Sequence, residues 1–249
     1  MNSLNLAAIG NCQIGSLLDE HGRMVWTCLP QFDADPAFCR LLMPDEPSPE
    51  QGIYEIELID FDRAEQNYIR NTAIVQTTLY DAHGSAVRIT DFAPRFNLFG
   101  RVYHPLMLIR SLTPVGGWPR IKVRLRPAGD YGAQKAETTH GSNHIRYVLP
   151  DMVMRITTDV SLSSILDGNP FVLNETKHMI LFAECKLNAK RVNQALMNNL
   201  KINSEAILRK KKHLKPIYGA FVVIEDDFQY AINEKVWSLE KLLRIATEH

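Results

Sequence analysis

The chain has 249 residues, of which 45% are hydrophobic and 22% charged, and its formal net charge at pH 7 is zero. This length allows a sizeable core, and the composition excludes an intrinsically disordered chain or a polyelectrolyte built to bind nucleic acid. The first residues include no basic leader, and Gly10, Asn11 and Gln13 interrupt the apolar run. We therefore expect no secretory signal and no membrane span, and we expect a cytoplasmic location.

The first forty residues combine short apolar runs with turn signals. Residues 7–42 predict a strand, a glycine turn, a second strand and then a loop bounded by Pro30 and Pro36. The loop region contains two aromatic and two acidic side chains: Phe32, Asp33, Asp35 and Phe38. One interpretation is a sugar-contacting or interdomain loop. The alternative is that the aspartates cap local turns while the phenylalanines fill the core.

Runs of β-branched and aromatic residues recur through the first three quarters of the chain. They predict around nine strands, at residues 24–29, 53–59, 73–80, 86–92, 106–112, 121–125, 144–148, 153–157 and 178–182. Such a pattern with few helical stretches predicts a mainly β protein, an antiparallel β-sandwich.

Four hairpins are expected between these strands. Two share an Asp-X-His-Gly turn, in which Asp19 or Asp81 bonds back to the backbone and the glycine adopts a positive φ. We interpret the histidines of both turns as exposed turn residues. The other two hairpins are predicted at Gly116–Gly117 and at Pro150–Asp151.

The composition changes near residue 184. Residues 1–183 have a net charge of −4, whereas residues 184–249 have a net charge of +4 and are rich in lysine. The tail shows helical periodicity, which predicts an α-helical segment at the C-terminus. Its basic run at 209–215 is interpreted as a solvated helix end, with nucleic-acid binding as the weaker alternative.

No metal or catalytic cluster is indicated by spacing. Cys12, Cys28, Cys39 and Cys185 lack close pairs, so we expect buried, reduced thiols and no metal site. The histidines form no metal-binding or triad pattern either. Asp91 is expected to form a structural ion pair with Arg95, and Asp130 with a neighbouring arginine.

Four ordered blocks together resemble a known family. They are residues 7–42, the hairpin NTAIVQTTLYDAHGSAVRITDFAPRF at 71–96, RIKVRLRPAGDYG at 120–132 and GSNHIRY at 141–147. Residues 5–183 resemble the trehalase-like N-terminal domain of bacterial glycoside hydrolase family 15 proteins, which include glucoamylases and trehalases. The resemblance implies a supersandwich-like β-sandwich domain at 1–183 that packs against an (α/α)6 barrel, with residues 184–249 atypical for the family.

In that family the barrel supplies the two glutamates of an inverting hydrolysis. This sequence ends before such a barrel, so we expect no catalytic residues and no cofactor. The resemblance suggests a separate barrel, an α-glucoside or trehalose as partners, and the loop at 32–38 as the surface facing them.

Three hypotheses follow from the sequence. The first is a truncated, inactive N-terminal domain of a family 15 protein. The second is a carbohydrate-binding or assembly module that pairs with a separate barrel. The third gives the tail a role in binding nucleic acid or protein.

Overall fold

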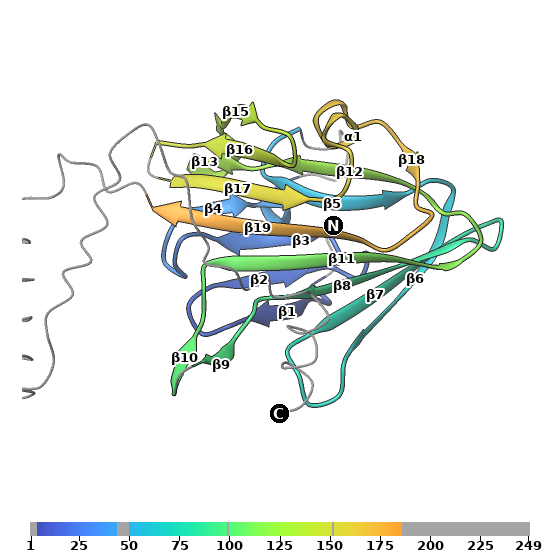
Figure 1. Cartoon of the computed structure of the whole chain (residues 1–249), viewed down its shortest axis with the longest axis horizontal. Coiled ribbons are helices and arrows are strands. Elements are labelled where there is room, and N and C mark those ends of the chain that lie inside the picture. Colours follow the sequence, from blue (N-terminus) through green and yellow to red (C-terminus); the bar gives the residue numbers. More distant parts are fainter. Residues whose placement is uncertain (1–3, 44–49, 99, 151, 186–249) are drawn as a thin grey trace, which may run out of the picture. The chain divides into compact units, whose positions relative to one another are not determined.

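The computed structural model describes residues 4–43, 50–98, 100–150 and 152–185 (Figure 1). The described part is mainly β with antiparallel strand pairing, which confirms the predicted fold class at that level. The predicted C-terminal helical segment, including the basic run at 209–215, lies outside the described residues.

The first sheet begins with the N-terminal hairpin. Its order is β1-β2-β3-β5-β12-β18, with β4 paired to β3. The strands are β1 (Ala7–Gly10), β2 (Gly15–Leu18), β3 (Met24–Cys28), β4 (Pro36–Phe38), β5 (Ile53–Leu58), β12 (Arg120–Arg126) and β18 (Phe171–Val172).

The second sheet contains most of the remaining strands. Its order is β15-β16-β17-β19-β11-β8-β7-β6. The strands are β6 (Phe61–Tyr68), β7 (Val75–Asp81), β8 (Ala86–Phe92), β11 (Met107–Gly116), β15 (Glu137–His140), β16 (His144–Val148), β17 (Met152–Thr158) and β19 (Lys177–Cys185).

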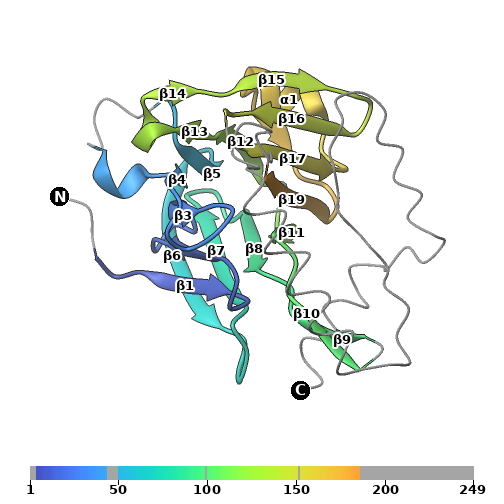
Figure 2. The same cartoon turned by 90° about the vertical axis from the view of Figure 1, so that its left-hand side faces the viewer.

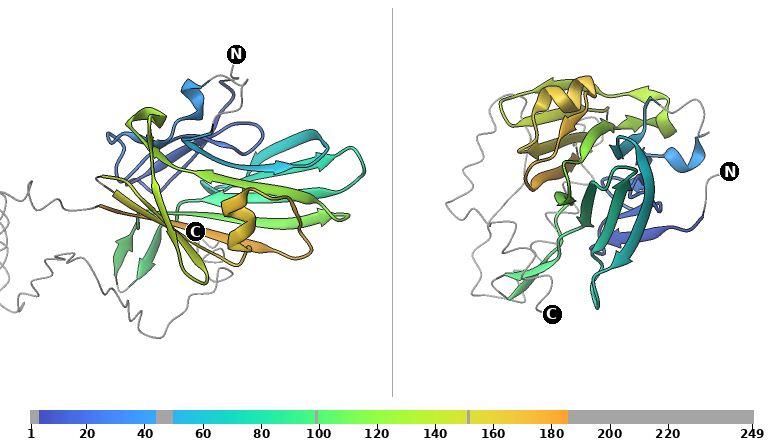
Figure 3. Two further views of the ribbon diagram at one scale, coloured as in Figure 1. Left: turned by 90° about the horizontal axis from the view of Figure 1, so that it is seen from above. Right: turned by 90° about the vertical axis from the view of Figure 1, so that its right-hand side faces the viewer.

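The smaller elements lie at the ends and edges of these sheets. One hairpin, formed by β9 and β10, projects away from both large sheets in every view (Figure 3). The small elements are β9 (Phe96–Leu98), β10 (Arg101–Tyr103), β13 (Ala128–Gly129), β14 (Gln134–Lys135), the short helices η1 (Arg40–Leu42) and η2 (Asp130–Gly132), and α1 (Leu162–Asp167).

One hydrophobic core joins the two sheets. In β12 the apolar residues Ile121, Val123 and Leu125 are fully buried, and they alternate with arginine and lysine on the outer face. Because alternate side chains of a strand point to opposite faces, this pattern fixes which face meets the core. Val87 and Ile89 of β8 belong to the same buried cluster from the other sheet.

The nine strands predicted from apolar runs are all present, with boundary shifts of a few residues. Strand β6 was not predicted, because its sequence FDRAEQNY is polar and largely exposed, so no alternation marks it. Three of the four hairpins form, at β2–β3, β7–β8 and β16–β17.

The hairpin predicted at Gly116–Gly117 is wrong. Strand β11 pairs with β8 and β19, whereas β12 pairs with β5 and β18 in the other sheet. The connection therefore crosses between the sheets. A Gly-Gly turn permits a chain reversal, but it does not determine whether the two flanking strands become hydrogen-bonded partners.

A buried ion pair lies inside the second sheet, at neighbouring positions of β8 and β11. Arg110 donates from Nε to Asp91 Oδ1 at 2.7 Å and from Nη2 to Asp91 Oδ2 at 3.0 Å. Both residues have 0% exposure. The predicted pairing of Asp91 with Arg95 is therefore wrong, since β-sheet register places Arg110 directly opposite Asp91.

The same arginine also binds the first sheet. Its Nη2 donates to the carbonyl of Gly22, in the β2–β3 turn, at 2.7 Å, and its guanidinium lies 4.5 Å from the centre of the Tyr54 ring. The ring face of an aromatic side chain attracts a cation. Arg110 thus connects the two sheets through a carboxylate, a carbonyl and an aromatic ring.

Replacing Asp91 with alanine leaves a buried guanidinium without its carboxylate, so we expect the free energy of unfolding to fall by about 3–5 kcal/mol. Urea denaturation followed by circular dichroism measures the change. The control is the double variant Asp91→Leu/Arg110→Met, which removes both charges and should lose much less stability. Equal losses in the single and double variants would contradict this role for the ion pair.

Candidate functional site

The structure separates the four residues predicted for the loop. Phe38 has 0% exposure and belongs to the core, where its ring centre lies 5.5 Å from that of Tyr54. Phe32 is 60% exposed, and Asp33 and Asp35 are also exposed. Three of the four therefore form a surface loop, and Phe38 follows the core-filling alternative because it lies in β4.

Phe32 lies over the end of the N-terminal hairpin. A Cβ atom on Gly15 would be only 2.8 Å from Phe32 Cε1, so the absence of a side chain at Gly15 makes room for the ring. We call residues 30–36 the acidic loop. Its aromatic ring is supported on one side by backbone and remains open on the other, an arrangement suited to contact with another molecule.

The two aspartates of the acidic loop act on a nearby thiol. Burial raises the pKa of Cys28, a hydrogen bond with Trp26 lowers it, and the charges of Asp35 and Asp33 raise it further. These carboxylates therefore create a negative potential at the end of β3. Trp26 lies 6.4 Å, centre to centre, from the half-exposed ring of Tyr131, which adds aromatic surface beside the loop.

The turn between β1 and β2 contains a buried asparagine that the sequence analysis did not identify. Asn11 is 1% exposed, and its Oδ1 accepts hydrogen bonds from the backbone N–H groups of Gln13 and Ile14. Its Nδ2 donates to the carbonyls of Pro94 and Pro105, at 3.1 and 2.8 Å. The signal available in sequence was only an Asn beside a Gly, which is typical of many turns.

Asn11 therefore holds the base of the projecting hairpin. We call the β9–β10 hairpin, with Arg95 and His104 at its base, the arm. Pro94 and Pro105 lie immediately outside this pair, so a single side-chain amide joins both ends of the arm to the β1–β2 turn. Two exposed contacts add to it, from Arg95 Nη1 to Cys12 Sγ at 3.0 Å and between His104 Nδ1 and Gln13 Oε1 at 2.7 Å.

The arm presents basic and apolar groups to solvent. Phe96 and Tyr103 stack with ring centres 5.7 Å apart, and Val102 and Tyr103 are 49% and 39% exposed. Arg95 and Arg101 are exposed as well. No acidic residue occurs between positions 94 and 105.

These three features lie at one end of the two sheets. The β1–β2 turn, the acidic loop and the arm are at the left in Figure 1 and face the viewer in Figure 2. The contact of Phe32 with Gly15 and the hydrogen bonds of Asn11 make the three segments contiguous. We call this surface the end face. It is the candidate functional site.

The cysteines follow the sequence expectation only in part. Cys28 and Cys39 are buried free thiols, and burial raises the pKa of Cys39 to about 11. Cys12 is exposed, contrary to the expectation, because it lies at the tip of the β1–β2 turn with a positive φ of 73°. The side chain of Cys185 lies outside the described residues.

A second network of charged residues, on the outer face of the first sheet, binds the short helix η1 to that sheet. Glu55 is 2% exposed and accepts a hydrogen bond from Arg124 at 2.6 Å, and Arg40 lies 3.6 Å away. Burial raises the pKa of Glu55, whereas Arg40 and Arg124 lower it. The carboxylate is held between two strands and a short helix, so we interpret this network as structural.

Asp130, for which an arginine partner was predicted, forms no ion pair within the described ranges.

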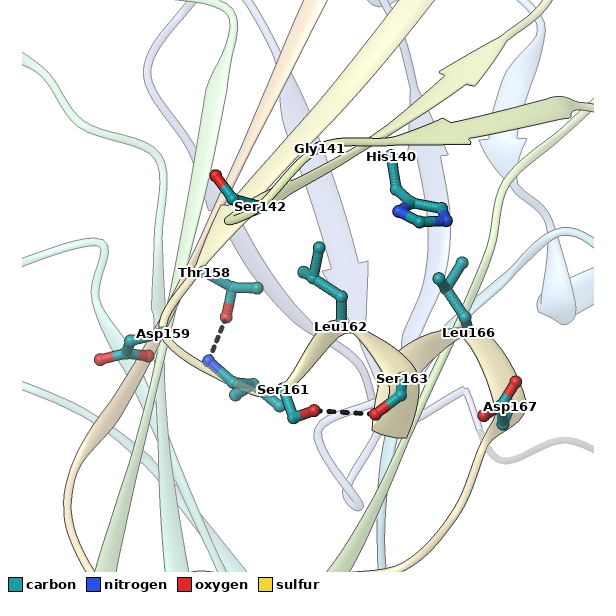
Figure 4. Close-up of a pocket in the computed structure, with 11 residues that line it drawn as sticks. His140, Gly141, Ser142, Thr158, Asp159, Ser161, Leu162, Ser163, Leu166 and Asp167 are labelled. Atoms are coloured by element: carbon teal, nitrogen blue, oxygen red, sulfur yellow. Dashed lines mark hydrogen bonds between the residues drawn. The ribbon is translucent and has the colours of Figure 1, made fainter.

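An open hollow of about 700 Å³ lies between the β15–β16 turn and α1 (Figure 4). Its hydroxyl groups are used locally: Thr158 Oγ1 accepts from the N–H of Val160 and donates to the carbonyl of His178, and Ser161 pairs with Ser163. We therefore assign no binding role to this hollow.

The described residues hold no group of three or more side chains placed to bind a metal ion. No helix among them combines the length and apolar character needed to cross a membrane.

Comparisons with known proteins leave the family resemblance a prediction. No protein-family model and no curated protein matches the chain. One solved structure, an active YidC insertase with the first transmembrane domain resolved, aligns with 86% of this chain and 47% of its own at 10% identity and a TM-score of 0.43. The chain thus spans about half of that structure, and at this TM-score the likeness carries no argument about function.

Replacing Asn11 with aspartate keeps the acceptor for the turn but places a carboxylate oxygen against two carbonyls. We expect the free energy of unfolding to fall by about 2–3 kcal/mol, since two buried acceptors lose their donor. Hydrogen exchange should also become faster in peptides that cover the arm. As a control, Gln13→Ala removes only an exposed contact and should cost less than about 0.5 kcal/mol. Unchanged exchange of the arm in Asn11→Asp would contradict this assignment.

Proposed function

We propose that this chain is a cytoplasmic, non-catalytic β-sandwich domain of a glycoside hydrolase family 15-like protein, and that hydrolysis requires a barrel from outside these 249 residues. The support is the antiparallel β architecture, which extends through all four sequence blocks of the resemblance. Two residues of those blocks, Asn11 and Asp91, make the buried polar contacts that connect distant segments.

The observation that carries the non-catalytic role is the placement of the acidic loop. Inverting hydrolysis needs two carboxyl groups on opposite faces of a sugar, roughly 6.5–9.5 Å apart, with room for a water between one of them and the sugar. Asp33 and Asp35 are two residues apart on one exposed loop, so a sugar bound there would meet both from the same side. They are suited to accepting hydrogen bonds from hydroxyl groups, with Phe32 stacking on the sugar ring.

That chemistry supports the second candidate, a carbohydrate-binding or assembly module. The 60% exposure of Phe32 beside two exposed carboxylates is the observation that favours it. In this version the loop holds an α-glucoside or trehalose at the edge of a catalytic pocket that a separate barrel completes.

The first experiment measures glucose release from trehalose, maltose and short α-glucans by the pure chain. We expect no release above the buffer blank, because Asp33 and Asp35 share one exposed loop and cannot lie on opposite faces of a sugar. Adding a glucoamylase to parallel maltose and α-glucan samples, and a trehalase to parallel trehalose samples, checks that the substrates and the assay work. Robust turnover by the chain alone would overturn the non-catalytic proposal, and its loss in Asp33→Asn/Asp35→Asn would assign that turnover to the acidic loop.

The second experiment tests the loop by calorimetric titration with a linear α-glucan. If the loop binds sugar, Phe32→Ala should weaken the affinity by roughly tenfold, since an aromatic stacking contact is lost. Trp118→Ala is the matched control, because Trp118 is 70% exposed and belongs to the β11–β12 connection. An absence of heat, or equal weakening in both variants, would remove the carbohydrate-binding version.

A further inference from the structure

The end face carries opposite charges on its two sides. The acidic loop contributes Asp33 and Asp35 and contains no basic residue, whereas the arm contributes Arg95 and Arg101 and contains no acidic one. Arg101 and both aspartates form no ion pair with any other residue in the described part of the chain. The β1–β2 turn lies between the two charged segments and contacts each of them.

We propose that the end face is a self-association surface, on which two copies of this chain form a symmetric dimer. A two-fold axis through the region of the β1–β2 turn places the arm of one copy on the acidic loop of the other, and the reverse. In a two-fold interface every contact occurs twice, so a surface must be complementary to itself. A basic segment and an acidic segment on either side of a common centre meet that requirement.

Apolar groups accompany the charges on both sides. Phe32 on the acidic loop is 60% exposed, and Val102 and Tyr103 on the arm are 49% and 39% exposed. The dimer would bury these side chains against each other, with the arginines and aspartates around them. Apolar and aromatic groups at the centre with polar groups at the rim are typical of protein interfaces.

The base of the arm is held in place before any partner binds. The bonds of Asn11 to both of its ends, and the stacking of Phe96 on Tyr103, reduce the freedom that association would otherwise remove. Preorganisation of this kind favours binding. The proposal does not depend on the family assignment, and a family 15 barrel that occupied the acidic loop would compete with the second copy.

The test is the molar mass of the full chain in solution. Sedimentation velocity and light scattering, over concentrations from about 1 to 100 μM, should show a monomer–dimer equilibrium that weakens as salt rises, because salt screens charge pairs. Arg101→Glu, and separately Asp33→Arg/Asp35→Arg, should each weaken the dimer about tenfold or more, since like charges then face each other twice.

Mixing the two charge-reversed proteins provides the decisive measurement. In the mixture, the altered arm of one protein meets the altered loop of the other, and the unaltered arm meets the unaltered loop, so both contacts become attractive again. The mixture should therefore form a heterodimer although each protein alone is a monomer. Arg88→Glu, an exposed arginine on β8, is the matched control and should leave the dimer unchanged.

Three outcomes would overturn the proposal. The first is a wild-type chain that stays monomeric at about 100 μM, a concentration at which a dimer with a lower Kd would be populated. The others are a dimer that both charge reversals leave intact, and charge-reversed proteins that form no heterodimer when mixed. Unchanged circular dichroism and melting temperature in each variant show that lost association is not lost folding. The altered side chains are exposed, so we expect both to be preserved.

Discussion

The structure depends on the cation of Arg110. Its guanidinium is completely buried, and it is neutralised by Asp91 on the neighbouring strand, bonded by the Gly22 carbonyl and covered by the Tyr54 ring. Nη1 of Arg110 has no acceptor among the described residues, so the ring face supplies part of the charge compensation. A buried charge is tolerated only where all of these groups are in position. Because the groups come from both sheets, this requirement constrains how the two sheets are placed relative to each other.

Asn11 imposes a similar constraint at the end face. One amide group satisfies two N–H groups within its own turn and two carbonyls more than eighty residues away. The turn, the arm and, through Gly15, the acidic loop are thereby held together. The proposed functions use this same surface, because it combines fixed backbone with exposed aromatic and charged side chains. Because Asn11 fixes the β1–β2 turn, the acidic loop and the arm present these groups in a defined arrangement.

The sequence predicted local features well and pairings poorly. Alternating apolar residues located strands such as β8 and β16 with correct ends, and the Asp-X-His-Gly turns formed as expected, with Asp19 and Asp81 accepting from the backbone. The errors concern partners. The Gly116–Gly117 connection crosses between sheets, and Asp91 binds Arg110 in place of Arg95.

In the candidate site, too, local features were predictable from the sequence and long-range contacts were not. Its composition, an aromatic residue and two acids between prolines, is a property of the sequence, whereas the burial of Phe38, the support of Phe32 by Gly15 and the role of Asn11 appear only in three dimensions. By itself the sequence located the strands that apolar runs mark, the two Asp-X-His-Gly turns and the charge of each segment, because these depend on neighbouring residues. Only the tertiary structure decided which sheet each strand joins and which segments share the end face, because those depend on contacts between residues distant in the chain.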